Sequence, residues 1–138
     1  MLDTLIVSPE QVLFSGQAKS ISVPGANGSF TIYPQHCPLL SSLSQGTVVI
    51  EPLEGEVEVL YLESGTVAIR DNTVKVFADV VFKAREEQEA LILKEREKVS
   101  SQLDQQLSAI NTQELLTQLS KLNAQLTAIQ KLRKYKKR

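Results

Sequence analysis

The sequence predicts an all-β part followed by an α-helical part: a flattened antiparallel β sandwich over residues 1–83 and an antiparallel two-helix hairpin over residues 84–138. All six glycines and all five prolines of the 138 residues lie at or before Gly65, so the typical turn-forming residues stop halfway along the chain. Apolar residues alternate along short segments before Lys83, whereas after it they recur at helical spacing. This change of period predicts two architectures joined end to end.

Short apolar and β-branched segments, separated by turn residues, predict the strands of the sandwich. We expect strands at residues 2–7, 12–14, 18–23, 30–32, 47–50, 56–62, 66–69 and 73–77, and a loop at 35–45. Turns are expected at Pro24–Gly28, at Ser64-Gly65 and at Asp71-Asn72. Strands that recur about every 8–12 residues with turns between them are typical of a sandwich or barrel.

Residues 56–62 show the alternation most clearly. One face is expected to carry Val57, Val59 and Tyr61, and the other Glu56, Glu58, Leu60 and Leu62. The neighbouring carboxylates of Glu54, Glu56 and Glu58 are interpreted as a solvated strand face, in preference to an acid/base pair or a cation site.

After Lys83 the residues are mostly strong helix formers, with apolar residues on one face of each predicted helix. In the first helix, at 85–110, this stripe consists of Ile92, Val99, Leu103, Leu107 and Ile110. A break is expected at Asn111-Thr112, with Thr112 as the N-cap of the second helix. The second stripe consists of Leu115, Leu119, Leu122, Leu126 and Ile129.

The predicted hairpin is only marginally stable by itself. Burying one leucine contributes roughly 1.5–3 kcal/mol, whereas ordering each residue costs roughly 1–2 kcal/mol of backbone entropy. We therefore expect the hairpin to need a docking surface and to be able to detach from it and extend.

No arrangement of residues in the sequence predicts an enzyme. His36 and Cys37 are adjacent, so their side chains point apart in an extended loop, and we interpret His36 as a loop or packing residue. One cysteine excludes an internal disulfide framework and a multi-cysteine zinc site. With no glycine-rich phosphate loop either, we expect no catalytic residues, no metal, no cofactor and no nucleotide-binding residues. No apolar run reaches the roughly 20 residues of a membrane span, and the N-terminus does not have the pattern of a secretory signal.

The net charge of −1 hides an uneven distribution along the chain. Residues 1–84 carry −5, residues 85–130 carry −2, and residues 131–138 carry +6. The basic tail has three interpretations that composition does not separate: a solvated helix end, an arm for an acidic protein, or a site for nucleic acid or anionic lipid.

One long segment of the chain is similar to a known protein family. The segment Gly28-Ser-Phe-Thr-Ile-Tyr-Pro-Gln-His-Cys-Pro-Leu-Leu40, with Leu5-Ile-Val-Ser-Pro9 before it and Gly46-Thr-Val after it, resembles the epsilon subunit of bacterial and plastid F-type ATP synthases, the delta subunit in mitochondria. Within it, Pro34, His36, Pro38, Leu39 and Leu40 match the family's Pro-x-His-x-Pro-Leu-Leu pattern. The resemblance covers the whole chain in order.

The resemblance implies a non-catalytic rotor subunit that couples proton flow to rotation. Its implied partners are the gamma subunit and the c-ring for the sandwich, and the alpha and beta subunits for an extended hairpin that resists ATP hydrolysis. The implied contacts are Ser29, His36, Pro38 and Leu39 toward gamma and the c-ring, and Arg133, Lys134, Lys136 and Lys137 toward an acidic loop of beta. The implied location is peripheral, on the cytoplasmic face of the bacterial inner membrane, with the plastid thylakoid as the alternative.

The sequence departs from the family at three positions or motifs. Ser29 replaces a carboxylate associated with the c-ring contact. Cys37 stands where small residues such as alanine are common, which implies a small buried or semi-buried filler. The stretch Arg85–Leu91 has no arginine at the position of the family's ATP-binding motif, so we expect no tight ATP binding. The alternative function is a small β domain whose basic helix binds nucleic acid or an anionic membrane.

Overall fold

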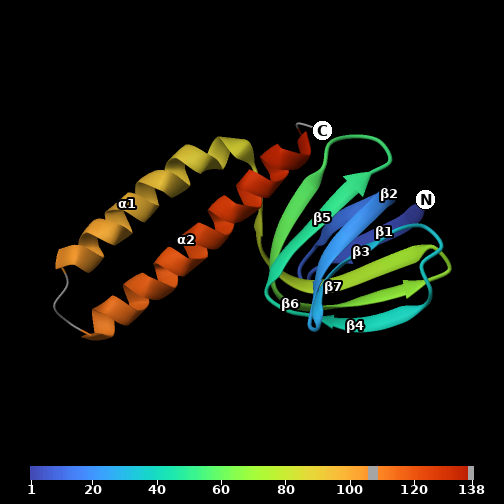
Figure 1. The fold of residues 1–138 in the computed structure, drawn as a ribbon, viewed down its shortest axis with the longest axis horizontal. Helices are drawn as coiled ribbons and strands as arrows, with labels where there is room; N and C mark the ends of the chain where they lie inside the picture. Colours follow the sequence, from blue (N-terminus) through green and yellow to red (C-terminus); the bar gives the residue numbers. More distant parts are fainter. Residues whose placement is uncertain (106–108, 137–138) are drawn as a thin grey trace.

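The computed structural model describes residues 1–105 and 109–136, and it confirms the predicted fold class (Figure 1). The strands are β1 Leu2–Val7, β2 Val12–Gly25, β3 Gly28–Ile32, β4 Leu39–Leu43, β5 Gly46–Pro52, β6 Glu58–Arg70 and β7 Thr73–Lys83. A 3₁₀ turn, η1 Glu86–Gln88, leads into helices α1 Glu89–Gln105 and α2 Ala109–Lys136.

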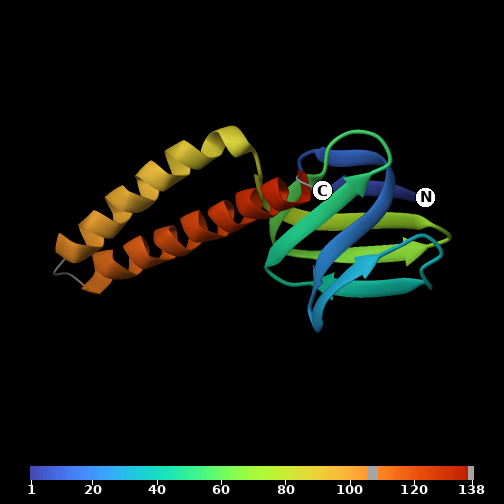
Figure 2. The same ribbon diagram turned by 45° about the horizontal axis from the view of Figure 1, so that its top comes forward.

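The strands form two packed layers because β2, β6 and β7 each contribute to both (Figure 2). In the first layer β5 lies between the end of β2 and the start of β6, with β3 and the end of β7 at the edges. In the second layer β1 and the start of β7 lie between the start of β2 and the end of β6, with β4 beyond β6.

Irregular pairing marks the places where the long strands pass between layers. The register shifts between Ala18 and Ser20 in β2, and between Tyr61 and Ser64 in β6. Such bulges bend a strand and increase its twist. The turn predicted at Ser64-Gly65 is therefore wrong, because β6 bends there and continues.

Further features differ from the sequence prediction. Residues 12–14 and 18–23, expected as two strands, belong to one strand, β2. Residues 39–43, expected within a loop, form β4; the sequence Leu-Leu-Ser-Ser-Leu has no two-residue alternation to reveal a strand. In addition, β1 pairs with β7 in parallel, although the other pairings are antiparallel. No hairpin turn joins these two strands, so local sequence carries no sign of their pairing.

The sandwich core lies between the two layers. Its fully buried side chains include Leu2, Ile6, Ile21, Ile32, Val48, Ile50, Leu60, Leu62, Val67 and Val74. The predicted alternation in β6 is confirmed, because Leu60 and Leu62 belong to this core whereas Val59 belongs to a second cluster on the outer face.

The helices form the predicted antiparallel hairpin. α1 runs away from the sandwich, and α2 returns so that its C-terminal end lies beside the sheet (Figures 1 and 2). The break predicted at Asn111-Thr112 is wrong, because both residues lie within α2. Asparagine and threonine each cost at most about 0.7 kcal/mol in a helix relative to alanine, too little to end one.

Both predicted apolar stripes pack together in the second cluster. It contains Ile92, Val99, Leu103, Leu115, Leu119, Leu122, Leu126 and Ile129, together with Ala84, Ala128 and Leu132. Leu107 and Ile110, also predicted for the stripe, lie outside the residues whose side chains are described. The sheet contributes Val49 of β5 and Val59 of β6, so the outer face of the first layer supplies the expected docking surface. Neither described helix is long and apolar enough to cross a membrane.

Candidate partner-binding surfaces

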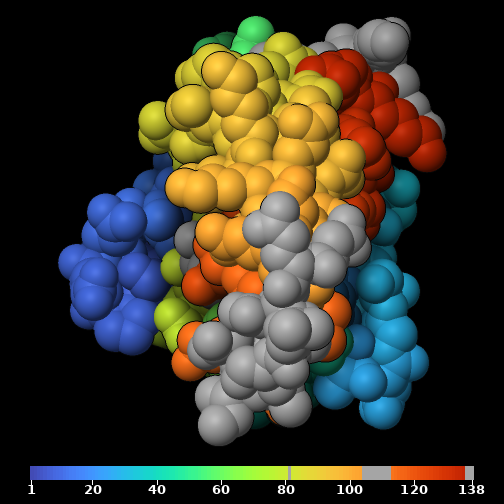
Figure 3. Space-filling view, turned by 90° about the vertical axis from the view of Figure 1, so that its left-hand side faces the viewer, coloured from blue at the N-terminus to red at the C-terminus, as the bar shows by residue number. Residues whose placement is uncertain are grey.

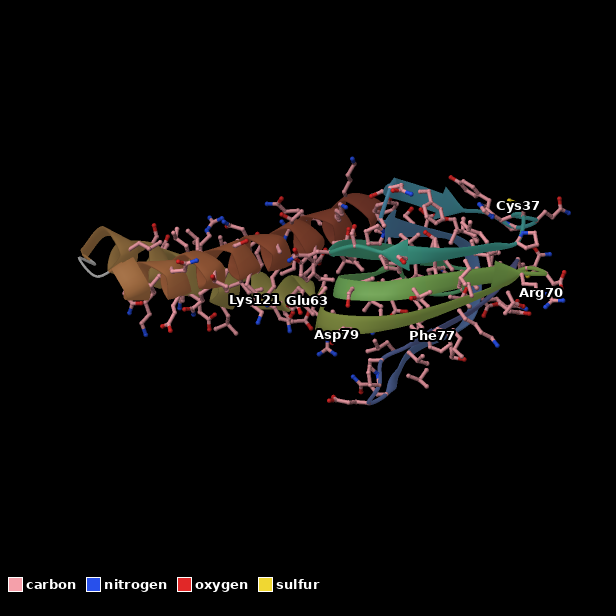
Figure 4. The ribbon with its side chains drawn as sticks, turned by 90° about the horizontal axis from the view of Figure 1, so that it is seen from below. Cys37, Glu63, Arg70, Phe77, Asp79 and Lys121 are labelled. Carbon is pink, nitrogen blue, oxygen red and sulfur yellow. The ribbon has the colours of Figure 1, made fainter. Side chains whose placement is uncertain are left out.

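The first candidate surface is the loop between β3 and β4, residues 33–38, with the first residues of β4; we call residues 33–40 the distal loop. It lies at the end of the sandwich farthest from the hairpin, where Figure 4 labels Cys37 and Arg70. Tyr33 is 62% exposed and Leu40 is 74% exposed, and Pro38 and Leu39 are also exposed. Several apolar side chains of the distal loop are therefore exposed, with Leu39 and Leu40 on opposite faces of β4 because neighbouring strand residues alternate.

The distal loop is held by the turn between β6 and β7. The Gln35 backbone N–H donates to Asn72 Oδ1 at 2.6 Å. Gln35 has φ +69°, and Asp71 and Asn72 have φ +51° and +59°. Consecutive left-handed residues form the tight turn that suits the twist of paired strands, so the turn predicted at Asp71-Asn72 is confirmed. The hydrogen bond from Gln35 to Asn72 orders the loop backbone that carries the exposed apolar side chains.

His36 packs within this loop, as predicted. Its ring centroid lies 6.4 Å from that of Phe30, and its Nδ1 lies 2.8 Å from the Cys37 carbonyl oxygen. A carbonyl oxygen only accepts, so Nδ1 carries the proton and is not a base for the Cys37 thiol, whose Sγ is 3.9 Å away. Cys37 itself is exposed, so the prediction of a buried filler is wrong. Adjacent residues of an extended loop point to opposite sides, so Cys37 faces solvent where the half-buried His36 ring lies toward Phe30.

Ser29 lies apart from the other residues predicted to contact gamma and the c-ring. His36, Pro38 and Leu39 share the distal loop, whereas Ser29 is at the start of β3 and exposed. It borders a groove of about 490 Å³ between the β2–β3 turn and α2, where Thr127 and Lys131 form the opposite wall.

The second candidate surface is the basic end of α2, residues 131–136. Lys131 Nζ donates to Thr47 Oγ1 of β5 at 2.7 Å. The Arg133 guanidinium forms a salt bridge and hydrogen bond with the Glu89 carboxylate in the first turn of α1. Glu89, aided by Glu86, raises the pKa of Arg133 above its ordinary value, so this side chain keeps its charge. The α2 end is thus tied to both α1 and the sheet.

The remaining predicted basic residues are described to different extents. Lys134 is exposed, and it makes no ion pair within residues 1–105 and 109–136. The Lys136 side chain and the whole of Lys137 lie outside the described residues. Figure 3 looks onto the tip of the hairpin and shows the end of α2 beside the start of α1.

The predicted acidic strand segment is largely solvated. Glu54 and Glu56 are exposed, and Glu58 pairs with Lys83 at 2.6 Å. Across the described part of the chain, no three His, Cys, Asp or Glu side chains come together as ligands for a metal ion.

Sequence reasoning missed several residues of both surfaces. Tyr33 and Leu40 are more exposed than the predicted contact Leu39, which is 37% exposed. For Leu40 the available signal is the pair of adjacent leucines in a segment rich in polar and turn residues. Glu89 and Thr47, which bind the basic end of α2, lie 44 and 84 residues from their partners and carried no sequence signal.

Comparisons with known proteins agree in family and fold. Residues 1–84 match the family described as "ATP synthase, Delta/Epsilon chain, beta-sandwich domain". The ATP synthase epsilon chain of Nitrosomonas europaea is 34% identical over 130 residues, which cover 94% of this chain and 92% of that protein.

Two solved structures share the fold at low sequence identity. A chain of the Euglena gracilis mitochondrial ATP synthase (OSCP/F1/c-ring) aligns with a TM-score of 0.66 at 13% identity, covering 93% of this chain and 81% of that chain. A chain of the Tetrahymena thermophila mitochondrial ATP synthase (central stalk/c-ring) aligns with a TM-score of 0.55 at 15% identity, covering 93% and 96%.

Proposed function

We propose a rotor function for this chain, which belongs to the ATP synthase delta/epsilon chain family as a non-catalytic subunit of the complex. In this proposal the sandwich binds the gamma subunit and the c-ring, and so couples proton flow to rotation. The helical hairpin, when it opens toward the alpha and beta subunits, restrains ATP hydrolysis. The solved complexes that share the fold, one of them a central stalk with its c-ring, support the proposed position.

The distal loop supports the coupling part of the proposal. Large apolar side chains that face solvent together mark interaction sites more often than chance exposure does. Here Tyr33, Pro38, Leu39 and Leu40 are exposed on a loop whose backbone is fixed by Asn72. A fixed loop loses little entropy on binding, which suits a contact that transmits torque. Ser29, outside this loop, would belong to a separate contact.

The basic end of α2 supports the inhibitory part. The tail of residues 131–138 carries six cations and no acid, on a chain whose first 84 residues carry −5. Such a tail fits an acidic protein surface, and Arg133, Lys134, Lys136 and Lys137 are the proposed contacts with the beta subunit. The single observation that carries this part is that Arg133 and Lys134 lie near the end of α2, whose apolar side chains belong to a cluster distinct from the sandwich core.

The proposed location follows from the complex. As part of an ATP synthase the subunit is peripheral to a membrane, and we propose the cytoplasmic face of the bacterial inner membrane, with the thylakoid as the alternative. Nucleic acid is not among the proposed partners, because the resemblance to the epsilon family implies a protein partner for the basic tail.

Replacing the proposed inhibitory cations tests the hairpin's role. The variant Arg133→Gln, Lys134→Gln, Lys136→Gln, Lys137→Gln should raise ATP hydrolysis by the assembled complex about two- to tenfold, since a few rim charge pairs each contribute up to roughly 1 kcal/mol. Lys94→Gln with Lys98→Gln, on exposed positions of α1, is the control and should leave hydrolysis unchanged. Equal rates of ATP hydrolysis by the two variants would contradict an inhibitory role for the cations at the end of α2.

A charge in the distal loop tests the coupling surface. Leu40→Glu should weaken binding of this subunit to the rest of the complex at least about tenfold, because a carboxylate would be buried without a partner. Leu91→Glu places the same charge on the exposed side of α1, where Leu91 is 67% exposed, and should bind normally. Normal binding by Leu40→Glu would show that the distal loop is not a contact.

A further inference from the structure

The hairpin is attached to the sandwich mainly by apolar packing. Val49 and Val59 on the outer face of the sheet share a cluster with Leu126 and Ile129 of α2. Apolar packing of this kind is non-directional, so it favours burial without fixing the exact position of a helix. Polar bonds at defined positions add that precision. Lys131 binds Thr47 of β5, and Arg133 with Glu89 and Arg96 with Asn123 join α2 to α1.

Arg133 joins the two ends of the hairpin. It lies in the last turns of α2, and its partner Glu89 lies in the first turn of α1. A cation near a helix C-terminus and an anion near a helix N-terminus each interact favourably with the helix dipole. Glu86, in the turn before α1, adds a further attraction for the guanidinium. Figure 3 shows the end of α2 beside the start of α1.

The pair is accessible to a competitor. The Arg133 side chain is 41% exposed and that of Glu89 is 27% exposed, so solvent and a partner protein reach them. A surface ion pair of this exposure contributes modestly to stability and exchanges readily for another carboxylate. Yet while Arg133 is bound to Glu89, the Glu89 carboxylate already neutralises its charge and occupies one of its nitrogens, so the guanidinium binds a carboxylate of another protein more weakly.

We propose that the Arg133–Glu89 pair is a latch, and that Glu89 competes with an acidic surface of a partner protein for the same guanidinium. While the pair is intact, it adds to the apolar packing that closes the hairpin, and it occupies the cation. Loss of the pair shifts the equilibrium toward the open hairpin and releases the cation at the same time. The competition rests on the proposed inhibitory function, whereas the latch does not.

Hydrogen exchange in the isolated full-length chain tests the latch. Glu89→Gln keeps the shape of the side chain and removes its charge, and Glu87→Gln removes an exposed charge two residues earlier as a control. We expect amides near the end of α2 to exchange about two- to fivefold faster in Glu89→Gln than in Glu87→Gln. In the exchanged pair Glu89→Arg with Arg133→Glu, the rate should return toward that of the unsubstituted chain.

ATP hydrolysis by the assembled complex tests the competition. Glu89→Gln frees Arg133 for the partner, so inhibition should deepen, with hydrolysis falling about two- to fivefold. Arg133→Gln also opens the latch but removes the shared cation, so it should not deepen inhibition. The variant Glu89→Arg with Arg133→Glu restores the ion pair, so its hairpin should stay closed and inhibition of ATP hydrolysis should not deepen. A merely structural ion pair would make Glu89→Gln and Arg133→Gln equivalent.

The outcomes separate the latch from the proposed function. Equal exchange rates near the end of α2 in Glu89→Gln and Glu87→Gln would overturn the latch. Equal effects of Glu89→Gln and Arg133→Gln on hydrolysis would overturn the competition. Faster exchange in Glu89→Gln, with hydrolysis unchanged in every variant, would support the latch and overturn both the competition and the proposed inhibition.

Discussion

The sandwich and the hairpin bury similar residue types but are held together differently. In the sandwich, strands bonded across two layers enclose side chains such as Ile50 and Leu62, which are fully buried. In the hairpin, each helix buries one apolar stripe, and the cluster that the two stripes form also includes Val49 and Val59 of the sheet. One region is a closed core and the other is a docked appendage. We therefore expect the sandwich to act as a rigid platform and the hairpin to move without unfolding it.

Replacing a leucine by alanine should affect the stability of the sandwich differently in the two regions. The largest loss is expected in the sandwich core. Leu62→Ala leaves a cavity in the closed core and should lower the free energy of unfolding of the sandwich by about 2–5 kcal/mol. Urea unfolding followed by circular dichroism measures this loss. Leu116→Ala, at a position that is 53% exposed on α2, is the control and should change the sandwich little. A loss below about 1 kcal/mol for Leu62→Ala would contradict a tightly packed core.

Gly65→Ala tests how closely β6 and β7 approach where β6 bends. A Cβ built at Gly65 lies 2.7 Å from the Phe77 carbonyl oxygen, a backbone atom that cannot rotate away. We expect Gly65→Ala to lower the free energy of unfolding of the sandwich by about 1–3 kcal/mol, as at other overpacked sites. Gly28→Ala is a useful comparison because a Cβ there meets nothing within 4 Å, although its φ of +130° adds backbone strain. An unchanged midpoint of urea unfolding for Gly65→Ala would show that β6 and β7 move apart at this position at little cost.

Leu126→Ala should have the smallest effect on the sandwich and a local effect on the hairpin. Leu126 is buried between the helices and the sheet, so its truncation costs about 2–3 kcal/mol of docking free energy. Because the sandwich core does not include it, the strand amides should exchange as in the unsubstituted chain. Faster exchange throughout the strands would mean that the two regions unfold together.

Local patterns in the sequence predicted the features that depend on local chemistry. The alternation at Leu60 and Leu62, the turn at Asp71-Asn72 and the helical stripe through Leu122 and Ile129 each follow from the spacing of neighbouring residues. The change of architecture near Lys83 also follows from local composition.

Features that depend on distant residues were not predictable in this way. Nothing near Gly65 indicates that β6 bends and continues, because the partner that requires a glycine there is the β7 backbone. The parallel pairing of β1 with β7 and the contact of Arg133 with Glu89 likewise join residues far apart in the chain. The site residues show the same division. The packing of His36 was predictable from its adjacency to Cys37. The contacts of Asn72 with Gln35 and of Glu89 with Arg133 were visible only in the folded chain.

Native-state hydrogen exchange of the unsubstituted chain in increasing urea tests the two-region account most directly. We predict that amides of α1 and α2 exchange through a local opening with a small urea dependence, and that amides of β2, β5 and β6 exchange only through global unfolding. If helix and strand amides instead share one opening free energy and one urea dependence, the hairpin does not move independently of the sandwich and the account is wrong.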